Sequence, residues 1–203
     1  MTSDFVPCYQ AVCEWAAVHG IAIKEEALPP GKAGEFTGRL VTMNHEYGAE
    51  ERLYYLIHAL GSIVLWSSNK AGVEQMFNDL RDAKSEKAHN PSRLETAIVS
   101  YRRFEVEASE HAVWLLGQLG QGEKVPSYTN FMWADLEAMT EFHRTGKAPV
   151  WCEFFDRWNH DVASGRRPVR PFNSKPIPHF QPVLTERQEI LQRQPGANES
   201  PAD

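Results

Sequence analysis

The segment from Ala49 to Ser67 reads AEERLYYLIHALGSIVLWS, and it decides the fold that the rest of the chain must fit. Its large aliphatic residues recur every three or four positions, which is the spacing of one face of an α-helix. A second flank of the same helix carries Tyr54, His58, Gly61 and Leu65. Because both flanks are largely apolar, we expect a long helix that is buried over much of its circumference.

The residues before this helix predict a first helix and a small sheet. Apolar residues recur at helical spacing from Tyr9 to His19, and Gly20 follows where a helix would stop. Two β-rich stretches come next, Ile21 to Lys24 and Glu35 to Asn44, and the prolines and glycines of residues 29–34 mark turns between them. We therefore expect short strands that form an antiparallel sheet.

The residues after the long helix predict further helices and then an irregular tail. Segments with apolar stripes extend over Val73–Ala83, Leu94–Leu119, Thr129–Arg144 and Val150–Ala163, and a polar loop is expected at Lys84–Asn90. The prolines that follow Gly165 exclude a regular helix. We expect a mainly helical α+β fold, with one domain over residues 1–164 and a Pro-rich, largely irregular tail over residues 165–203, mobile after about Gln181.

The composition indicates a globular protein without affinity for membranes or nucleic acid. Of the 203 residues, 42% are hydrophobic and 11% aromatic, and the formal net charge is -6. No run of about eighteen apolar residues and no signal-peptide pattern occurs. We expect a cytoplasmic protein with no membrane contact and no direct nucleic-acid contact. Cys8, Cys13 and Cys152 have neither disulfide nor zinc-finger spacing, and we interpret them as reduced packing residues.

A carboxylate interrupts the apolar stripe of the segment Leu94–Leu119. By the 100° step of a helix, Glu105 lies about 40° from Tyr101 and so inside the stripe, whereas Glu107 points elsewhere. Burying an unpaired carboxylate costs several kcal/mol, so Glu105 needs a cationic, metallic or hydrogen-bonding partner. His58, on the other buried helix, is the first candidate.

Three segments together resemble the ImmA/IrrE metallopeptidase family in their order and spacing. They are EFTGRLVTMN at Glu35–Asn44, the helix at Ala49–Ser67 and FEVEASEHAVWLL at Phe104–Leu116, which resemble the strand, the HExxH helix and the ExEAxxxA helix of that family. In the family, two histidines and the later glutamate hold zinc, while the glutamate inside HExxH activates the metal-bound water. The resemblance covers about half of the chain and implies a zincin-like peptidase core.

The resemblance assigns roles to individual positions. His58 matches the first histidine ligand and Glu105 matches the ligand glutamate, with Glu107 the weaker match by helical phase. Ala59 stands where the general base would be, and Ser62 stands where the second histidine would be. The motif HALGS therefore lacks two parts that zinc hydrolysis needs. We expect the fold of the family without its chemistry, no catalytic residue and no cofactor.

Two states of this site stay open. In one, His58 is a core residue that is hydrogen-bonded to Glu105 or to a tyrosine. In the other, zinc is retained by His58 and Glu105 with a recruited histidine, for which His45 and His111 are the nearest candidates. We expect His111 to be partly exposed, His45 to lie in a loop, and Glu105 to be less exposed than Glu107.

An aromatic stripe near the end of the domain has two interpretations. It consists of Trp151, Phe154, Phe155 and Trp158. It could anchor a partner helix or line a ligand pocket. We expect instead that it belongs to the core and packs against Phe131, Leu136 and Met139.

The Pro-rich tail carries candidate partner-binding residues, namely Arg166, Arg167, Arg170 and Phe172. A basic segment of this kind could dock on an acidic or aromatic groove of a partner, or lie across the acidic surface of its own chain. A solvated linker is the third interpretation.

Taken together, the residues favour a non-catalytic regulatory or protein-binding protein derived from a zinc metallopeptidase scaffold. Members of the family often accompany repressors of phages, mobile elements or stress responses, so the resemblance implies another protein as the partner. The alternatives are a metal-dependent hydrolase or peptidase with a rearranged site, and an unrelated helical α+β protein. Metal content separates the first two hypotheses.

Overall fold

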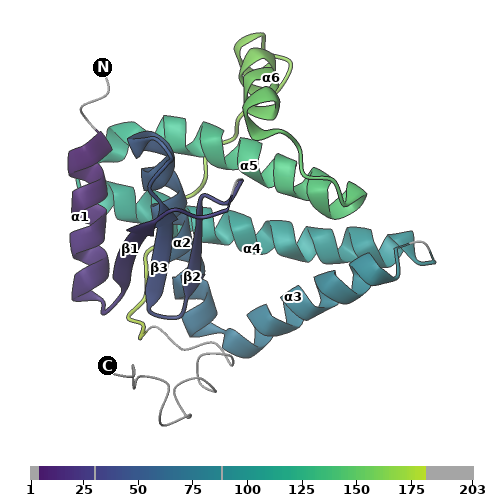
Figure 1. Cartoon of the computed structure of the whole chain (residues 1–203), viewed down its shortest axis with the longest axis horizontal. Helices are drawn as coiled ribbons and strands as arrows, with labels where there is room; N and C mark the ends of the chain where they lie inside the picture. The colour runs from purple at the N-terminus through teal and green to yellow at the C-terminus, as the bar shows by residue number, and fades with distance from the viewer. Residues whose placement is uncertain (1–4, 30, 88, 182–203) are drawn as a thin grey trace, which may run out of the picture.

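The chain folds into a mainly helical α+β structure (Figure 1). The computed structural model describes residues 5–29, 31–87 and 89–181. Their helices are α1 (Phe5–Val18), α2 (Ala49–Ser68), α3 (Lys70–Ser85), α4 (Pro91–Gln118), α5 (Val125–Thr145) and α6 (Trp151–Ala163), with a short 3-10 helix η1 (Gly122–Lys124) before α5. The strands are β1 (Ala22–Glu26), β2 (Gly34–Thr37) and β3 (Leu40–Asn44).

The sheet formed by the described residues is mixed, so the prediction of an antiparallel sheet was wrong. The strand order is β1-β3-β2; β1 runs parallel to β3, and β2 runs antiparallel to it. A tight turn at Gly38 and Arg39 joins β2 to β3, and the positive φ of Gly38, 60°, suits the first central position of a type II′ turn. The chain between β1 and β2 therefore places the returning strand β3 in the middle, beside β1 and pointing the same way.

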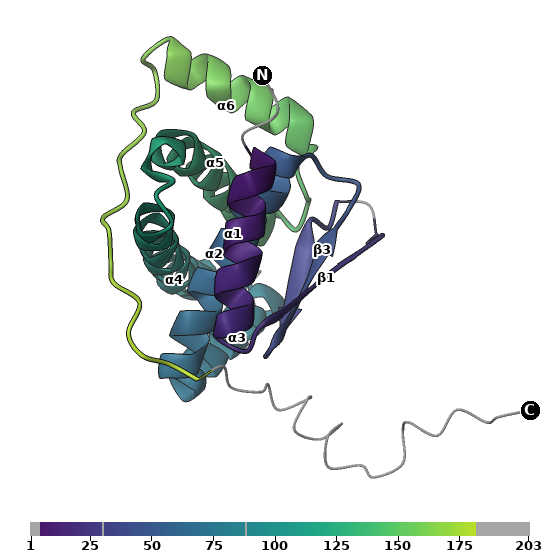
Figure 2. The same cartoon turned by 90° about the vertical axis from the view of Figure 1, so that its left-hand side faces the viewer.

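Helix α2 is the centre of the molecule, as its two apolar flanks predict. It packs against α1, α4 and both hairpin strands, and its aliphatic face is buried, including Leu53, Leu56, Ile57, Leu60 and Val64. Figure 2 shows the sheet on one side of the helical body, with α1 and α2 between it and α4. Burial of one such aliphatic side chain contributes about 1.5–3 kcal/mol, so this helix contributes much of the core.

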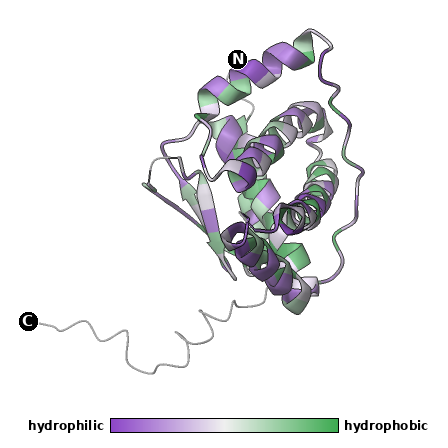
Figure 3. Ribbon diagram, turned by 90° about the vertical axis from the view of Figure 1, so that its right-hand side faces the viewer, coloured by the Kyte–Doolittle hydropathy of each residue, from purple (hydrophilic) through white to green (hydrophobic). Residues whose placement is uncertain are grey.

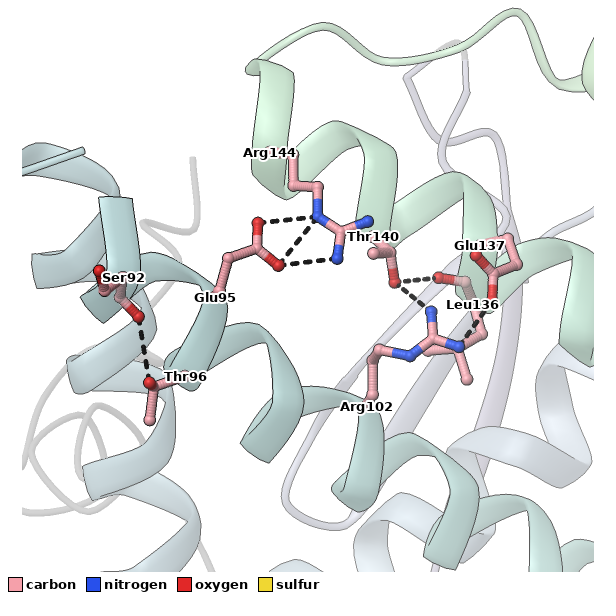
Figure 4. A network of polar contacts seen from close by, with 8 residues as sticks. All are labelled: Ser92, Glu95, Thr96, Arg102, Leu136, Glu137, Thr140 and Arg144. Carbon is pink, nitrogen blue, oxygen red and sulfur yellow. Dashed lines mark hydrogen bonds and ion pairs between the residues drawn. The ribbon is translucent and has the colours of Figure 1, made fainter. Parts of the chain in front are cut away.

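Polar contacts join α4 to α5 along their outer flank (Figure 4). The Arg102 guanidinium donates to Thr140 Oγ1 at 2.7 Å and to Glu137 Oε1 at 2.6 Å. Nearer the loop, Arg144 binds both carboxylate oxygens of Glu95 in a bidentate pair. These contacts hold the two helices in register, although pairs this exposed contribute about 1 kcal/mol or less each.

Residues Gly165 to Gln181, which we call the strap, run along the outside of the helices. Figures 2 and 3 show from opposite sides how the strap leaves α6 and passes α5 and α4 toward the end of α1. Its Phe172 is 7% exposed and its ring stacks on Trp133, with centroids 5.0 Å apart. Phe180 stacks on Trp15 of α1 and on His19, which follows α1. The strap thus contains no helix or strand and is docked on its own chain.

Several boundaries and packing predictions need correction. Helix α5 begins at Val125 rather than Thr129, because Pro126 occupies the first turn, where its missing N–H costs nothing. Leu136 and Met139 pack on the side of α5 that faces α4, away from the aromatic stripe of α6. Cys152 is exposed and so is not a packing residue. The expectation of mobility after Gln181 concerns residues outside the described part of the chain.

Candidate functional site

The candidate site lies where α2 passes between the sheet and α4. Helix α2 begins at a point where the Gly48 N–H donates to Glu51 Oε2 at 3.2 Å, and Glu50 and Glu51 in its first turn suit the positive end of the helix dipole. Helix α4 begins with Asn90, whose side chain accepts from the Arg93 N–H, followed by Pro91. Both helices therefore have well-defined starts.

The predicted approach of His58 and Glu105 is confirmed. Nε2 of His58 lies 2.7 Å from Oε2 of Glu105, a hydrogen-bond distance, and the two side chains are 13% and 16% exposed. Glu107, two residues further on, has a side chain that is 35% exposed and forms an ion pair with Lys175 of the strap. Helical phase thus selected the inward-facing carboxylate correctly.

A close backbone contact sets the spacing between the two helices. A Cβ atom built on Gly61 would lie 2.1 Å from the carbonyl oxygen of Ala108, so only glycine fits there. Gly61 lies one turn after His58, and Ala108 lies one turn after Glu105. The contact therefore brings α2 and α4 together directly beside the histidine–glutamate pair.

Three further polar residues surround this pair. Oγ of Ser109 lies 3.4 Å from Nδ1 of His58 and donates to the Glu105 carbonyl oxygen at 2.9 Å. Tyr55 donates to Oδ1 of Asp135, on α5, at 3.2 Å. Burial raises the pKa of Asp135 to about 6, while nearby His58 lowers it and Glu105 raises it. The site is therefore a network across α2, α4 and α5.

Asp135 was not among the residues predicted for the site. It belongs to α5, outside the segments that carry the family resemblance. One signal could have found it: Asp135 follows the buried Phe131 by four residues, so the two share one side of their helix. A carboxylate on an apolar side of a helix needs a hydrogen-bonding or charged partner, as Glu105 does.

Beside the pair lies an open cleft of about 200 Å³ between α2 and the hairpin β2–β3. His58, Ala59, Ser62 and Glu105 all line it, and its other walls are mostly apolar, formed by residues such as Phe36, Met43, Phe77 and Phe104. Ala59 and Ser62, which the resemblance aligns with the general base and the second histidine ligand, therefore face the same space as His58. Their own side chains are a methyl group and a hydroxyl.

One wall of the cleft is an edge strand. The Asn44 N–H donates to the Ala33 carbonyl at 2.8 Å, and this pair continues the β2–β3 register. Since antiparallel pairs alternate between bonded and non-bonded, Glu35 and Thr37 bond to β3 as well. The backbone groups of Gly34 and Phe36 then point along the open edge of the sheet, next to the cleft.

The two histidines considered as additional zinc ligands, His45 and His111, do not line the cleft beside His58. His45 is exposed in the turn that follows β3, as predicted. His111 is 2% exposed, so the prediction of partial exposure was wrong. The strap covers it, and Nδ1 of His111 lies 3.0 Å from the Lys175 carbonyl oxygen. Desolvation lowers the pKa of His111, which favours the neutral ring as a hydrogen-bond donor to that carbonyl.

The residues of the tail predicted to contact a partner have contacts within the chain. Phe172 is buried against Tyr128 and Trp133, so its ring belongs to this protein's own core. Arg166 forms an ion pair with Asp161 at 2.7 Å. The Arg167 guanidinium lies 4.6 Å from the ring centroid of Trp158. Arg170 is exposed and its carbonyl oxygen accepts from Nε1 of Trp133 at 2.7 Å.

The side chains at the site do not fit a catalytic zinc ion. Such an ion takes three protein ligands and a base beside its bound water, whereas this cleft offers one imidazole, one carboxylate and the Ser62 hydroxyl. Within residues 5–29, 31–87 and 89–181, no three His, Cys, Asp or Glu side chains are grouped so that they could hold a metal.

Comparison with known proteins found no related family, protein or structure. No protein-family model matches the chain, and no curated protein or solved structure is significantly similar to it. None of the helices in the described segments combines the length and the apolar character that crossing a membrane requires.

Proposed function

We propose that this chain is a non-catalytic, peptidase-like regulatory protein of the ImmA/IrrE type, which holds a segment of another protein in the cleft between α2 and β2. The observation that carries the proposal is the contact of His58 with Glu105, 2.7 Å apart in the wall of an open cleft. Both residues occupy ligand positions of the zincin-like scaffold, while Ala59 and Ser62 replace the base and the second histidine.

The state of the cleft supports binding without catalysis. In a zinc peptidase the histidine and the glutamate share a metal ion, but here they bond to each other. Ala59 cannot accept a proton, and the Ser62 hydroxyl is a poor zinc ligand beside an imidazole. The space remains open and mostly apolar, which is what an apolar side chain of a bound segment requires.

The edge strand supports an extended peptide as the bound form. A peptide that adds to β2 gains main-chain hydrogen bonds from Gly34 and Phe36, and its alternate side chains point toward or away from the sheet. One inward apolar side chain would enter the 200 Å³ cleft beside Ala59 and Ser62. The partner is therefore a protein with an exposed extended segment that contains an aliphatic or aromatic residue.

Metal content and motif restoration test the scaffold. The purified protein should hold less than stoichiometric zinc, because one histidine ligand is missing. It should also show no chelator-sensitive proteolysis, because loss of a general base alone lowers the reaction rate by a factor of about 10²–10⁴. The double variant Ala59→Glu with Ser62→His should gain zinc affinity sharply, with the single variants as controls. Tightly held stoichiometric zinc in the wild type, lost in His58→Ala, would instead favour the metal-dependent hydrolase. A double variant that binds no zinc would count against the peptidase scaffold.

Displayed peptides test the cleft directly. A random peptide library selected on the wild type should yield binders with an apolar residue at one fixed position. Their affinity should fall at least tenfold in Ala59→Phe, which fills the cleft, and stay unchanged in Ala148→Phe, in the exposed loop after α5. Equal binding to both variants would show that the peptides do not use this cleft.

A further inference from the structure

A second cavity lies at the start of α2, where the starts of α1, α2 and α5 meet α6. Its volume is about 480 Å³, and it shares no lining residue with the cleft beside His58. Its lining includes four aromatic rings and two carboxylates, namely Phe5, Tyr54, Phe131, Phe155, Glu50 and Glu51. The proposed regulatory function makes no use of this cavity.

The rings form a continuous series of edge-to-face and tilted contacts. Phe5 meets Tyr54 with centroids 6.0 Å apart, Tyr54 meets Phe131 at 5.4 Å, and Phe131 meets Phe155 at 5.7 Å. The face of an aromatic ring carries partial negative charge, so rings that surround a cavity attract a cation. Phe5 already does so within this chain, since Nζ of Lys124 lies 4.5 Å from its ring centroid.

The charged groups of the cavity have one sign. Its lining includes two carboxylates and no lysine, arginine or histidine. Glu50 accepts from the Tyr54 hydroxyl at 3.1 Å and Glu51 accepts from the Gly48 N–H at 3.2 Å, so both are held in place. The positive end of the α2 dipole amounts to about half a charge, and Lys124 beside Phe5 adds a full one, so the two carboxylates still leave the site slightly negative.

We propose that this cavity binds an organic cation, either an alkylammonium or a guanidinium group. Phe155 supplies the aromatic wall, because Phe131 is only 3% exposed and the ring of Phe5 already contacts Lys124. Glu50 supplies the opposite charge at a distance set by its bond to Tyr54. A bare metal ion is a poorer match, since no three His, Cys, Asp or Glu side chains of the described residues are grouped here. The cation can belong to a small molecule or to a lysine or arginine side chain of a partner.

Ligand pairs that differ only in charge test the proposal on the intact chain. Choline and its neutral isostere 3,3-dimethylbutan-1-ol are titrated by calorimetry, and choline should bind at least tenfold more tightly. Guanidinium, N-acetyl-lysine amide and N-acetyl-arginine amide complete the set. If the amides bind more tightly than choline, the source is a protein side chain; the reverse order indicates a small quaternary ammonium compound.

Variants test which residues carry the recognition. Glu50→Gln keeps the shape but removes the charge, and Phe155→Leu keeps the apolar volume but removes the ring; each should weaken binding by about two- to thirty-fold. Glu46→Gln makes the same charge change at an exposed position outside the cavity and should leave binding unchanged. Thermal unfolding of each variant checks its folding.

The proposal is overturned if no cation binds the wild type at millimolar concentration, or if choline and the neutral isostere bind equally. It is also overturned if folded Glu50→Gln binds the cation as well as Glu46→Gln does. Since the comparison of choline with its isostere uses only the wild type, a variant that fails to fold does not remove the test.

Discussion

Gly61 and Ala108 bring α2 and α4 into backbone contact, since a Cβ atom on Gly61 would meet the Ala108 carbonyl oxygen at 2.1 Å. The helices cannot approach this closely at a residue with a side chain, and neither backbone can move without moving its neighbours. Because His58 and Glu105 lie one turn before these residues, the same contact fixes their distance.

Gly61→Ala should therefore destabilise the protein despite the higher helix propensity of alanine. Overpacking costs about 1–3 kcal/mol or more, against a gain of about 1 kcal/mol from propensity. Gly117→Ala is the matched control, because nothing lies within 4 Å of a Cβ atom there. Urea denaturation should show a loss of stability for the first variant and no loss for the second. Equal stabilities would mean that α2 and α4 separate readily.

A double-mutant cycle on His58 and Glu105 should reveal a coupled pair. Each single alanine variant leaves a mostly buried polar partner, and we expect a cost of about 1–3 kcal/mol in the free energy of unfolding. The coupling energy should be about 1–2 kcal/mol. The pair of Glu95 with Arg144, whose side chains are about half exposed, should give less than about 1 kcal/mol in a parallel cycle. A coupling near zero would show that the 2.7 Å contact does not stabilise the fold.

Asp135 should make stability fall as pH rises. Burial raises its folded-state pKa from 3.8 to about 6, so between these values the folded state binds more protons than the unfolded state. The folded state is then favoured below pH 4, and the stability from this group is lost as pH rises through about 6. Asp135→Asn should be more stable than the wild type by about 1–3 kcal/mol at pH 7.5, but not at pH 4. Asp156→Asn, on the exposed side of α6, serves as the control. A difference that does not change with pH would contradict this assignment.

Phe172 should hold the strap on the helices. Phe172→Ala removes a buried ring from contact with Trp133 and Tyr128, which typically costs about 3–5 kcal/mol. Proteinase K should then cleave residues 165–181 much faster than in the wild type. His179→Ala changes an exposed residue of the same segment and should leave the cleavage rate unaltered. If the two variants are cleaved alike, Phe172 does not anchor the strap.

Sequence periodicity predicted much of the helical framework. The long helices predicted at Ala49–Ser67 and Leu94–Leu119 are found at Ala49–Ser68 and Pro91–Gln118, and the approach of His58 to Glu105 is confirmed. The helices were predictable because the 3.6-residue period determines which side chains share a face of a helix. The contact was predictable because a carboxylate inside an apolar stripe needs a polar or charged partner.

The remaining features depend on long-range contacts that periodicity does not encode. The sheet is mixed because of where the chain places β3, which no residue of the strands specifies. His111 is buried because the strap returns across it, and Phe172 is buried for the same reason. Asp135 joins the site only because α5 packs against α4 and α2. Each of these outcomes depends on tertiary packing between segments far apart in the sequence.

The strap also imposes an order on the formation of the structure. During synthesis, α1 and α4 emerge long before Phe180. Trp15 and His111 therefore lack their strap contacts until nearly all of the described residues have been synthesised. Closing so long a loop is entropically costly and slow compared with helix formation. The final contact therefore joins the earliest and the latest parts of the described chain, and a nascent chain that stops before Phe172 leaves the rings of Trp15 and Trp133 without their strap partners.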